Sequence, residues 1–279
     1  MSMKTEQTAP SMEVLAAFGL QGLTPRLLAD GQGRSWSATS AILRPVDDAA
    51  EAEYTAELYA GLAENGFRIP RPIVSTNGSY ICEGWAAWRF LPGRHDCQGD
   101  WQSMLNVCRA FHKALEGLDP PAFLATPRHH WAQADRIAWQ EERCGERWNL
   151  RDAIEKHLEL CDPADRRLPK QLIHGDMAGN LLFEEGLDPG VIDFSPYWRP
   201  AAYAMAICVA DAIAWYGADG SVLERSYPLG VTDSLLRRAC VFRLAAVSAS
   251  PLRGAADQQF ELSAFSNVIA LLGRPHPLD

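Results

Sequence analysis

The sequence predicts an α+β fold with a small, β-rich N-terminal part and a larger, mostly helical C-terminal part. Before Pro92-Gly93, short apolar runs alternate with glycine-containing turns, as in strands joined by tight connections. After it, apolar residues recur at helical spacing, most clearly over 101–115. A single strand-like hairpin at 172–194 interrupts the helical part. We therefore predict two domains, residues 1–92 and 93–279.

The N-terminal domain is expected to consist of a sheet and two helices. Residues 27–46 are predicted to form a strand, a turn at Gly31 and Gly33, a second strand that ends near Trp36, and a third over 40–46. Further short strands are expected near 80–82 and 86–91, and a short helix over 12–18. A longer helix is expected from Asp48 to Asn65, capped by Asp47 or Asp48 and ended by Gly66. Asn77-Gly78 lies between two strand-like runs and predicts a hairpin turn.

The C-terminal domain is expected to be helical around its hairpin. Helices are predicted over 101–115, 131–148, 152–161, 203–216, 232–248 and 258–272. Within the hairpin region, strands are expected at 171–174, 181–183 and 191–194, with a turn at 185–189.

Charge and cysteine content exclude several classes of function. The 279 residues carry a formal net charge of −9, which argues against non-specific nucleic-acid binding because that needs a basic face. No apolar run is long enough to span a bilayer and no targeting signal is evident. Seven irregularly spaced cysteines without a CxxC pair favour free thiols, and hence a cytoplasmic protein. Cys108 and His112 share a helix face, where core packing is favoured over a zinc site.

The hairpin region carries the residues with chemical potential. His174-Gly175-Asp176 follows a predicted strand, Asn180 follows four positions later, and Asp193 ends a neighbouring strand. Phosphoryl transfer needs a carboxylate that orients the attacking hydroxyl and oxygen ligands that hold Mg²⁺ against the phosphates. A hairpin would fix both acids on one rigid element.

This pattern resembles the signature of kinase-like small-molecule phosphotransferases, which include aminoglycoside phosphotransferases, choline kinases and fructosamine kinases. The chain as a whole is most similar to an actinobacterial branch of such proteins. The resemblance implies a two-lobed, protein-kinase-like fold, with ATP or GTP bound between the lobes. It also implies that Asp176 is the catalytic base and that Asn180 and Asp193 are Mg²⁺ ligands, whereas His174 is expected to fix the loop by hydrogen bonding.

The N-terminal domain offers matching nucleotide-binding candidates. Gly31 and Gly33 lie where a glycine-rich loop would cover the phosphates, since glycine lets backbone N–H groups approach closely. Arg44 stands where the relatives have a phosphate-binding lysine, and a helix glutamate should pair with it. Glu53 is the first choice and Glu57 the second, although both also suit a solvated helix face.

An interlobe hinge is expected just before the change in composition. Phe90 and Leu91 precede Pro92-Gly93 and match the position of the hinge whose backbone binds the adenine edge.

Several positions depart from the pattern of the relatives. Asn180 follows Asp176 after four positions rather than five, and Ser195 replaces the usual glycine. No aspartate lies about a dozen residues beyond Asp193; Asp211 either takes over that scaffold role or faces solvent.

Two functions follow, and we expect the first. It is Mg²⁺-dependent transfer of the γ-phosphate of ATP or GTP to a hydroxyl of a small molecule. The alternative is a pseudokinase, a nucleotide- or partner-binding module without useful turnover, which the shortened loop and Arg44 would suit. Glu141 and Glu142 could line a binding site for a cationic acceptor molecule, or they could form an exposed helix face. Trp139 suits the core. The sequence does not indicate the acceptor or the oligomeric state.

Overall fold

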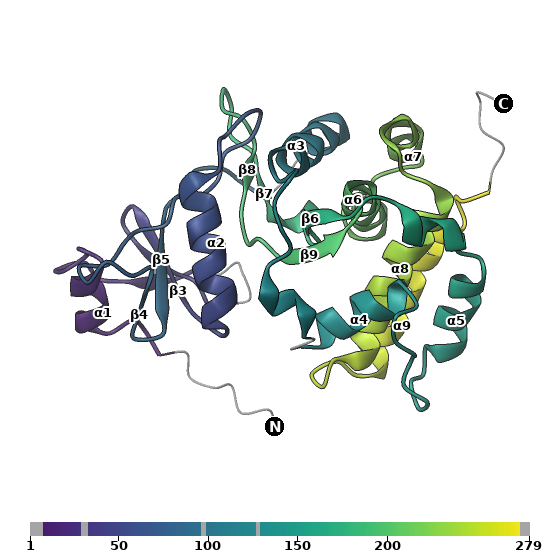
Figure 1. The fold of residues 1–279 in the computed structure, drawn as a ribbon, viewed down its shortest axis with the longest axis horizontal. Helices are drawn as coiled ribbons and strands as arrows, with labels where there is room; N and C mark the ends of the chain where they lie inside the picture. The colour runs from purple at the N-terminus through teal and green to yellow at the C-terminus, as the bar shows by residue number, and fades with distance from the viewer. Residues whose placement is uncertain (1–7, 29–32, 96–98, 127–128, 274–279) are drawn as a thin grey trace. The chain divides into compact units, whose positions relative to one another are not determined.

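The computed structural model describes residues 8–28, 33–95, 99–126 and 129–273, and the chain divides into two compact units (Figure 1). The first comprises the chain up to Arg94 together with 182–192, and the second comprises 95–181 and the residues from Asp193 onward. Part of the predicted hairpin therefore groups with the first unit. The assignment of residues 1–92 to nucleotide binding and of 93–279 to catalysis stays a prediction.

The first unit is built on a five-stranded antiparallel sheet in the order β1-β2-β3-β5-β4. Its strands are β1 (Arg26–Leu27), β2 (Trp36–Ala38), β3 (Ala41–Pro45), β4 (Ile81–Cys82) and β5 (Trp85–Arg89). Helix α1 (Met12–Ala17) packs its buried Val14 and Leu15 against Leu43 and its neighbours. Helix α2 (Ala49–Gly61) runs beside the sheet (Figure 1).

Helix α2 begins where predicted and ends earlier. Asp48 caps it, its Oδ1 accepting a hydrogen bond of 3.1 Å from the Glu51 N–H. The chain becomes extended at Leu62 rather than at Gly66. Arg71 donates to the carbonyl oxygens of Tyr59 and Leu62 at this end, so the last turn is satisfied without further helix.

The hairpin of the first unit uses a different turn from the predicted one. A turn does occur at Asn77-Gly78, closed by a bond of 2.9 Å from Ser75 N–H to the Ser79 carbonyl. However, the turn that joins the paired strands β4 and β5 is Glu83-Gly84, with φ of 49° and 73°. Two consecutive positive φ values are typical of a tight hairpin turn matched to strand twist.

The predicted hairpin at 172–194 is in fact parts of two separate two-stranded sheets. Strand β6 (Gln171–His174) pairs with β9 (Pro196–Arg199), which the sequence analysis missed, and β7 (Leu181–Leu182) pairs with β8 (Gly190–Val191). Strand β9 begins with Pro196, and a proline is tolerated at the first position of a strand. Asp193 therefore lies between β8 and β9, which belong to different sheets.

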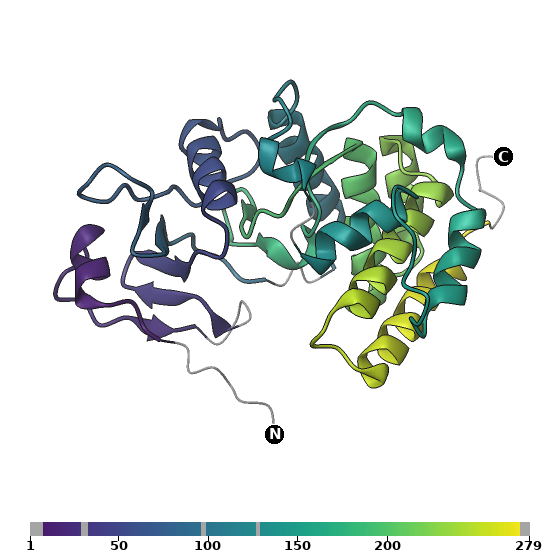
Figure 2. The same ribbon diagram turned by 60° about the horizontal axis from the view of Figure 1, so that its bottom comes forward.

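The second unit is a helical bundle centred on α8 (Asp233–Ala249). This helix contacts α4 (His130–Ala138), α5 (Arg151–Glu159), α6 (Ala201–Trp215) and α9 (Ala255–Ile269), and Figure 2 shows α8 and α9 side by side. Helix α3 (Trp101–Ala114) packs on α6 and α7 (Ser221–Ser226). Helix α7 was not predicted.

The predicted helix over 131–148 is wrong in its second half, because α4 ends at Ala138. Gln140 adopts a positive φ of 55°, which a helix does not allow. Trp139 is fully buried, and the guanidinium carbons of Arg199 and Arg238 each lie 5.1 Å from its ring centroid. This stacking fixes the end of the helix and confirms Trp139 as a core residue.

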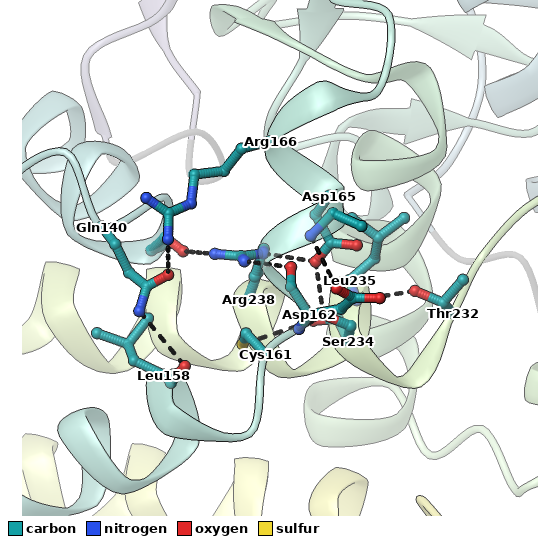
Figure 3. Close-up of polar contacts among 12 residues, drawn as sticks. Gln140, Leu158, Cys161, Asp162, Asp165, Arg166, Thr232, Ser234, Leu235 and Arg238 are labelled. Carbon is teal, nitrogen blue, oxygen red and sulfur yellow. Dashed lines mark hydrogen bonds and ion pairs between the residues drawn. The ribbon is translucent and has the colours of Figure 1, made fainter.

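Arg238 ties three segments of the second unit together (Figure 3). It is fully buried on α8 and donates to Asp165 Oδ2 at 2.7 Å, the Ala138 carbonyl at 2.8 Å and the Asp162 carbonyl at 3.0 Å. Ser234 donates to the same Asp165 oxygen at 2.5 Å. A buried charge is tolerated when its donors are satisfied in this way, so Arg238 is a structural residue.

The helices of the described residues are too short to cross a bilayer. Helix α8, the longest in the described ranges, has 17 residues, whereas a membrane span needs about 20 apolar residues. Accordingly, no helix in the part of the chain that the structure describes could span a membrane.

Candidate functional site

The loop that leaves β6 brings Asp176 and Asn180 together. The Asn180 side-chain Nδ2 donates to the Asp176 carbonyl at 2.6 Å and to Asp176 Oδ2 at 3.1 Å. The last turn of the loop is the short helix η4 (Ala178–Asn180). The Asp176 side chain is 45% exposed. The four-position spacing is therefore short enough to require a tight turn, yet it still places the amide beside the carboxylate.

Two buried histidines fix this loop from behind. His174 is fully buried, and its Nδ1 accepts hydrogen bonds from the backbone N–H groups of Asp176 at 3.2 Å and Ser195 at 3.4 Å. The His174 N–H donates at 3.0 Å to Nε2 of His112, whose Nδ1 donates at 2.7 Å to the Cys108 carbonyl. The predicted structural role of His174 is confirmed. His112, which the sequence placed only in the core, also supports the loop.

Gly175 is required by a close approach. A Cβ atom at this position would lie 2.4 Å from the Cδ2 and Cε2 ring atoms of Tyr197 on β9. Because β6 and β9 pair through Ile173 and Tyr197, the ring lies directly over the loop. Only glycine allows this packing.

Asp193 lies in a sparsely populated backbone conformation. Its φ of 52° is in the left-handed region, which aspartate tolerates better than most residues. Its carbonyl accepts a bond of 3.2 Å from the Ser195 Oγ, and Ser195 is joined to the loop through His174. The segment that carries Asp193 is thereby linked to the segment that carries Asp176.

The residues of this region suit a hard divalent cation. The amide nitrogen of Asn180 faces Asp176. The Asn180 amide oxygen and the Asp193 carboxylate are hard oxygen donors of the kind that Mg²⁺ prefers. No cluster of three or more His, Cys, Asp or Glu side chains arranged for a metal occurs among the described residues. Proteins usually hold Mg²⁺ through one or two side-chain oxygens together with substrate phosphates. The oxygens of Asn180 and Asp193 therefore fit Mg²⁺.

Asp211 is a buried scaffold residue and does not face solvent. It is 1% exposed, and its Oδ2 accepts from Arg243 Nη2 at 2.5 Å. Burial raises the pKa of Asp211 to about 6, against the opposing effect of Arg243. The same Arg243 nitrogen donates to Asp176 Oδ1 at 2.7 Å. Sequence reasoning missed Arg243, whose only signal is its position inside the apolar run 239–247.

The acids proposed for an acceptor site have structural partners instead. Glu141 accepts two hydrogen bonds, of 2.7 and 2.8 Å, from Arg199. Glu142 pairs with Arg136, and its Oε1 accepts from Gln133 at 2.7 Å. Neither glutamate is an exposed, unpartnered acid.

In the first unit, the glycine-rich segment is partly described. Gly31 lies outside the described residues, and Gly33 has a φ of 65°, which favours glycine. Arg34 forms a two-pronged ion pair with Asp47, both distances being 2.6 Å. The sequence analysis did not single out Arg34, although it directly follows Gly33.

The arginine expected to bind phosphates lies on β3. Arg44 is half-buried there, opposite Ala86 on β5.

The pairing of Arg44 with a glutamate of α2 stays a prediction. Glu53 and Glu57 are exposed on α2, and neither forms an ion pair with another residue in the described ranges. Glu51 is half-buried, and this burial, followed by the nearby Asp47 charge, raises its pKa. Helical periodicity alone did not identify which face of α2 is covered.

The predicted hinge residues, Phe90 and Leu91, follow β5 and differ in their hydrogen bonding. The Phe90 N–H donates to the Ser40 carbonyl at 2.8 Å, and the ring of Phe90 is 50% exposed. The Leu91 side chain packs so closely on Gly190 that a Cβ there would lie 2.5 Å from Leu91 Cδ2. The Leu91 N–H makes no hydrogen bond to any residue that the structure describes.

Comparison of the sequence with family models finds no match, and comparison with curated proteins finds none either. Solved structures do match. One is a thermostable mutant of aminoglycoside phosphotransferase APH(4)-Ia in complex with ADP and hygromycin B. It has a TM-score of 0.58 and 14% identity, over 94% of this chain and 98% of that one.

Two further matches act on other molecules. Amicoumacin kinase, in complex with AMP-PNP, Ca²⁺ and amicoumacin, has a TM-score of 0.56 and 15% identity, over 87% of this chain and 88% of that one. Choline kinase LicA from Streptococcus pneumoniae has a TM-score of 0.59 and 9% identity, over 92% of this chain and 97% of that one. The chain has the fold of these kinases. The predicted two-lobed, kinase-like α+β fold is thereby confirmed.

Proposed function

We propose that this kinase-fold chain is a phosphotransferase that moves the γ-phosphate of ATP or GTP to a hydroxyl group of a small molecule. The observation that carries the proposal is the loop after β6. It holds the Asp176 carboxylate against the Asn180 amide and is joined through His174 to the segment of Asp193. Similar structures contain ADP or AMP-PNP, which supports a nucleotide as the donor.

In this reaction Asp176 is the proton acceptor. The bond between the γ-phosphorus and its bridging oxygen breaks, a bond from the acceptor oxygen to phosphorus forms, and the hydroxyl proton passes to Asp176. An ionised carboxylate has about four lone-pair positions, so the contacts from Asn180 and Arg243 leave capacity for the hydroxyl. Phosphoryl transfer depends mainly on positioning and charge neutralisation.

We assign donor contacts to residues of the first unit. Gly31 and Gly33 would present backbone N–H groups to the phosphates, and Arg44 would neutralise them. Phe90 and Leu91 would bind the adenine edge. The Leu91 N–H, which has no hydrogen-bond partner among the described residues, supports this role. Glu53 remains a predicted partner of Arg44 without a contact in its favour.

Asn180 and Asp193 are proposed to hold Mg²⁺, which when bound would neutralise charge on the phosphates. Both supply hard oxygen donors. A Ca²⁺ ion accompanies AMP-PNP in the structure of amicoumacin kinase. The unusual backbone of Asp193 supports a functional reason for its placement, because such conformations persist where the surroundings impose them.

The experiment is a measurement of ADP release with ATP and a panel of hydroxylated compounds that includes aminoglycosides, amicoumacin and choline. Asp176→Asn is expected to lower turnover by about 10²–10⁴-fold, the usual contribution of a positioned acid or base, while nucleotide binding persists. Asp188→Asn, the same substitution at an exposed loop position, is the matched control and should keep full turnover.

Two results would contradict the proposal. One is equal turnover in wild type and Asp176→Asn. The other is nucleotide binding without turnover for every acceptor tested, which would favour the alternative of a pseudokinase that the short loop and Arg44 also suit.

A further inference from the structure

One guanidinium connects three parts of the candidate catalytic region. Arg243 lies on α8 and is 3% exposed. Its Nε donates to Asp211 Oδ1 at 3.0 Å, and its Nη2 donates to Asp211 Oδ2 at 2.5 Å. The same Nη2 donates to Asp176 Oδ1 at 2.7 Å and lies 3.4 Å from the Gly175 carbonyl oxygen. Arg243 therefore joins α6 to the loop that carries the proposed base.

Aromatic rings surround this guanidinium. Its central carbon lies 5.5 Å from the ring centroid of Trp131, 5.2 Å from that of Trp215 and 5.0 Å from that of Phe242. Burial lowers the pKa of Arg243, but the Asp211 and Asp176 carboxylates outweigh this effect and raise it. The residue is thus a fixed cation. Its ion pair with Asp211 is buried on both sides, whereas Asp176 is partly exposed.

The contacts distinguish the two oxygens of Asp176. Oδ1 is held by Arg243 and Oδ2 faces the Asn180 amide. A carboxylate on a loop would otherwise rotate about its side-chain bonds. Because each oxygen accepts a hydrogen bond, the carboxylate cannot rotate freely, and its remaining lone pairs have a defined orientation.

We propose that Arg243 is a positioning residue for phosphoryl transfer, which holds the Asp176 carboxylate in the orientation that receives the acceptor proton. The proposal rests on the proposed function. Asp211 on α6 holds the guanidinium of Arg243 on α8, and this guanidinium in turn holds Asp176 on the loop. Misplacement of a reacting group by about 1 Å can cost about 10²-fold in rate, which sets the scale of the effect.

Arg238 provides a matched structural control on the same helix. It is equally buried and equally bonded, but its partners are Asp165 and the carbonyls of Ala138 and Asp162, none of which belongs to the loop. Loss of either arginine should destabilise the fold. Only loss of Arg243 should change the chemical step.

The experiment compares Arg243→Lys and Arg243→Met with Arg238→Lys and Arg238→Met. The probes are thermal unfolding, ATP binding, and ADP release with water alone and with the best acceptor found. Arg243→Met is expected to lower kcat by about 10–100-fold with the KM for ATP changed by less than about twofold. Arg243→Lys should recover part of kcat, because a single ammonium can reach Asp176 but cannot form the same fork. The Arg238 variants should keep kcat at temperatures where they are folded.

A second measurement shows whether Arg243 acts through Asp176. In an Asp176→Asn background, Arg243→Lys should have no further effect on kcat, because the group that it positions has been neutralised. This comparison uses the milder substitution and remains informative if Arg243→Met does not fold.

The outcomes separate the two proposals. Three outcomes would overturn the role of Arg243 and leave the proposed function standing. They are a wild-type kcat in a folded Arg243 variant, an equal loss of kcat in the Arg238 variants, and additive effects of Arg243→Lys and Asp176→Asn. Absence of both ATP binding and turnover in the wild type would overturn the proposed function and this inference with it.

Discussion

Replacement of Gly175 by alanine tests how tightly the loop is built. The added Cβ would lie 2.4 Å from the Tyr197 ring, whereas ordinary contact begins at 3.4 Å, so the ring or the loop must move by about 1 Å. Tyr197 also packs edge-on against Phe242, with ring centroids 5.6 Å apart, and that contact would be disturbed. Overpacking of this kind costs about 1–3 kcal/mol, and each kcal/mol should lower Tm by about 2 °C or more in a chain of this size.

The matched control for this substitution is Gly179→Ala in the same loop. Its Cβ would lie 2.6 Å from the Tyr216 hydroxyl, but that hydroxyl ends a side chain that is 47% exposed and can rotate away. We expect Gly179→Ala to change stability by less than about 1 kcal/mol, since a compatible Gly→Ala change also restricts the unfolded chain. Chemical denaturation followed by circular dichroism measures both. Equal stability of the two variants would refute the packing argument.

A rescue experiment refines this test. If the clash with Tyr197 is the cause, Tyr197→Leu should cost less in the Gly175→Ala background than in the wild type, because the two residues are in contact. Additive effects would place the cause elsewhere.

Two further predictions concern buried charges. Asp135→Asn leaves the buried Arg199 with Glu141 as its acidic partner and should lower the free energy of unfolding by about 3 kcal/mol, the low end for a broken buried ion pair. Urea denaturation tests this, and an unchanged midpoint would contradict it. The pKa of Asp211 is raised to about 6 when folded, against about 3.9 when unfolded. The stability of wild type relative to Asp211→Asn should therefore fall as pH rises from about 4 to about 6, and then level off. Thermal unfolding across this range measures the difference, and a rise in that window would contradict the assignment.

The elements that could be predicted from the sequence are those set by local pattern. Helix α3 has a clear apolar face, and its observed bounds, Trp101–Ala114, lie within one residue of the prediction. The cap of α2 was predicted to be Asp47 or Asp48, and it is Asp48, because an aspartate before an alanine-rich run has a local reason to be there.

The elements that were missed depend on long-range packing. Strand β9 begins at Pro196 and exists because it pairs with β6, about 25 residues earlier in the chain. The end of α4 is set by Trp139, which stacks with arginines from β9 and α8. No local pattern reports such partners.

The candidate site divides in the same way. His174, Asp176, Asn180 and Asp193 could be found because their spacing forms a recognisable pattern. The ion pairs of Arg243 could not, because Asp211 and Asp176 lie 32 and 67 positions away from it in the sequence. The pairing of Arg44 with Glu53 or Glu57 stays a prediction, because the sequence does not show which face of α2 the neighbouring sheet covers.

The central claim is most directly tested by calorimetry of ATP and GTP binding with and without Mg²⁺. The wild type and Asp188→Asn are predicted to bind at least one nucleotide, and more tightly with Mg²⁺. Asp193→Asn should lose the Mg²⁺-dependent part of the binding, because it lacks the proposed carboxylate ligand. Absence of binding of both nucleotides at millimolar concentration, or Mg²⁺-dependent binding that persists in Asp193→Asn, would contradict the account.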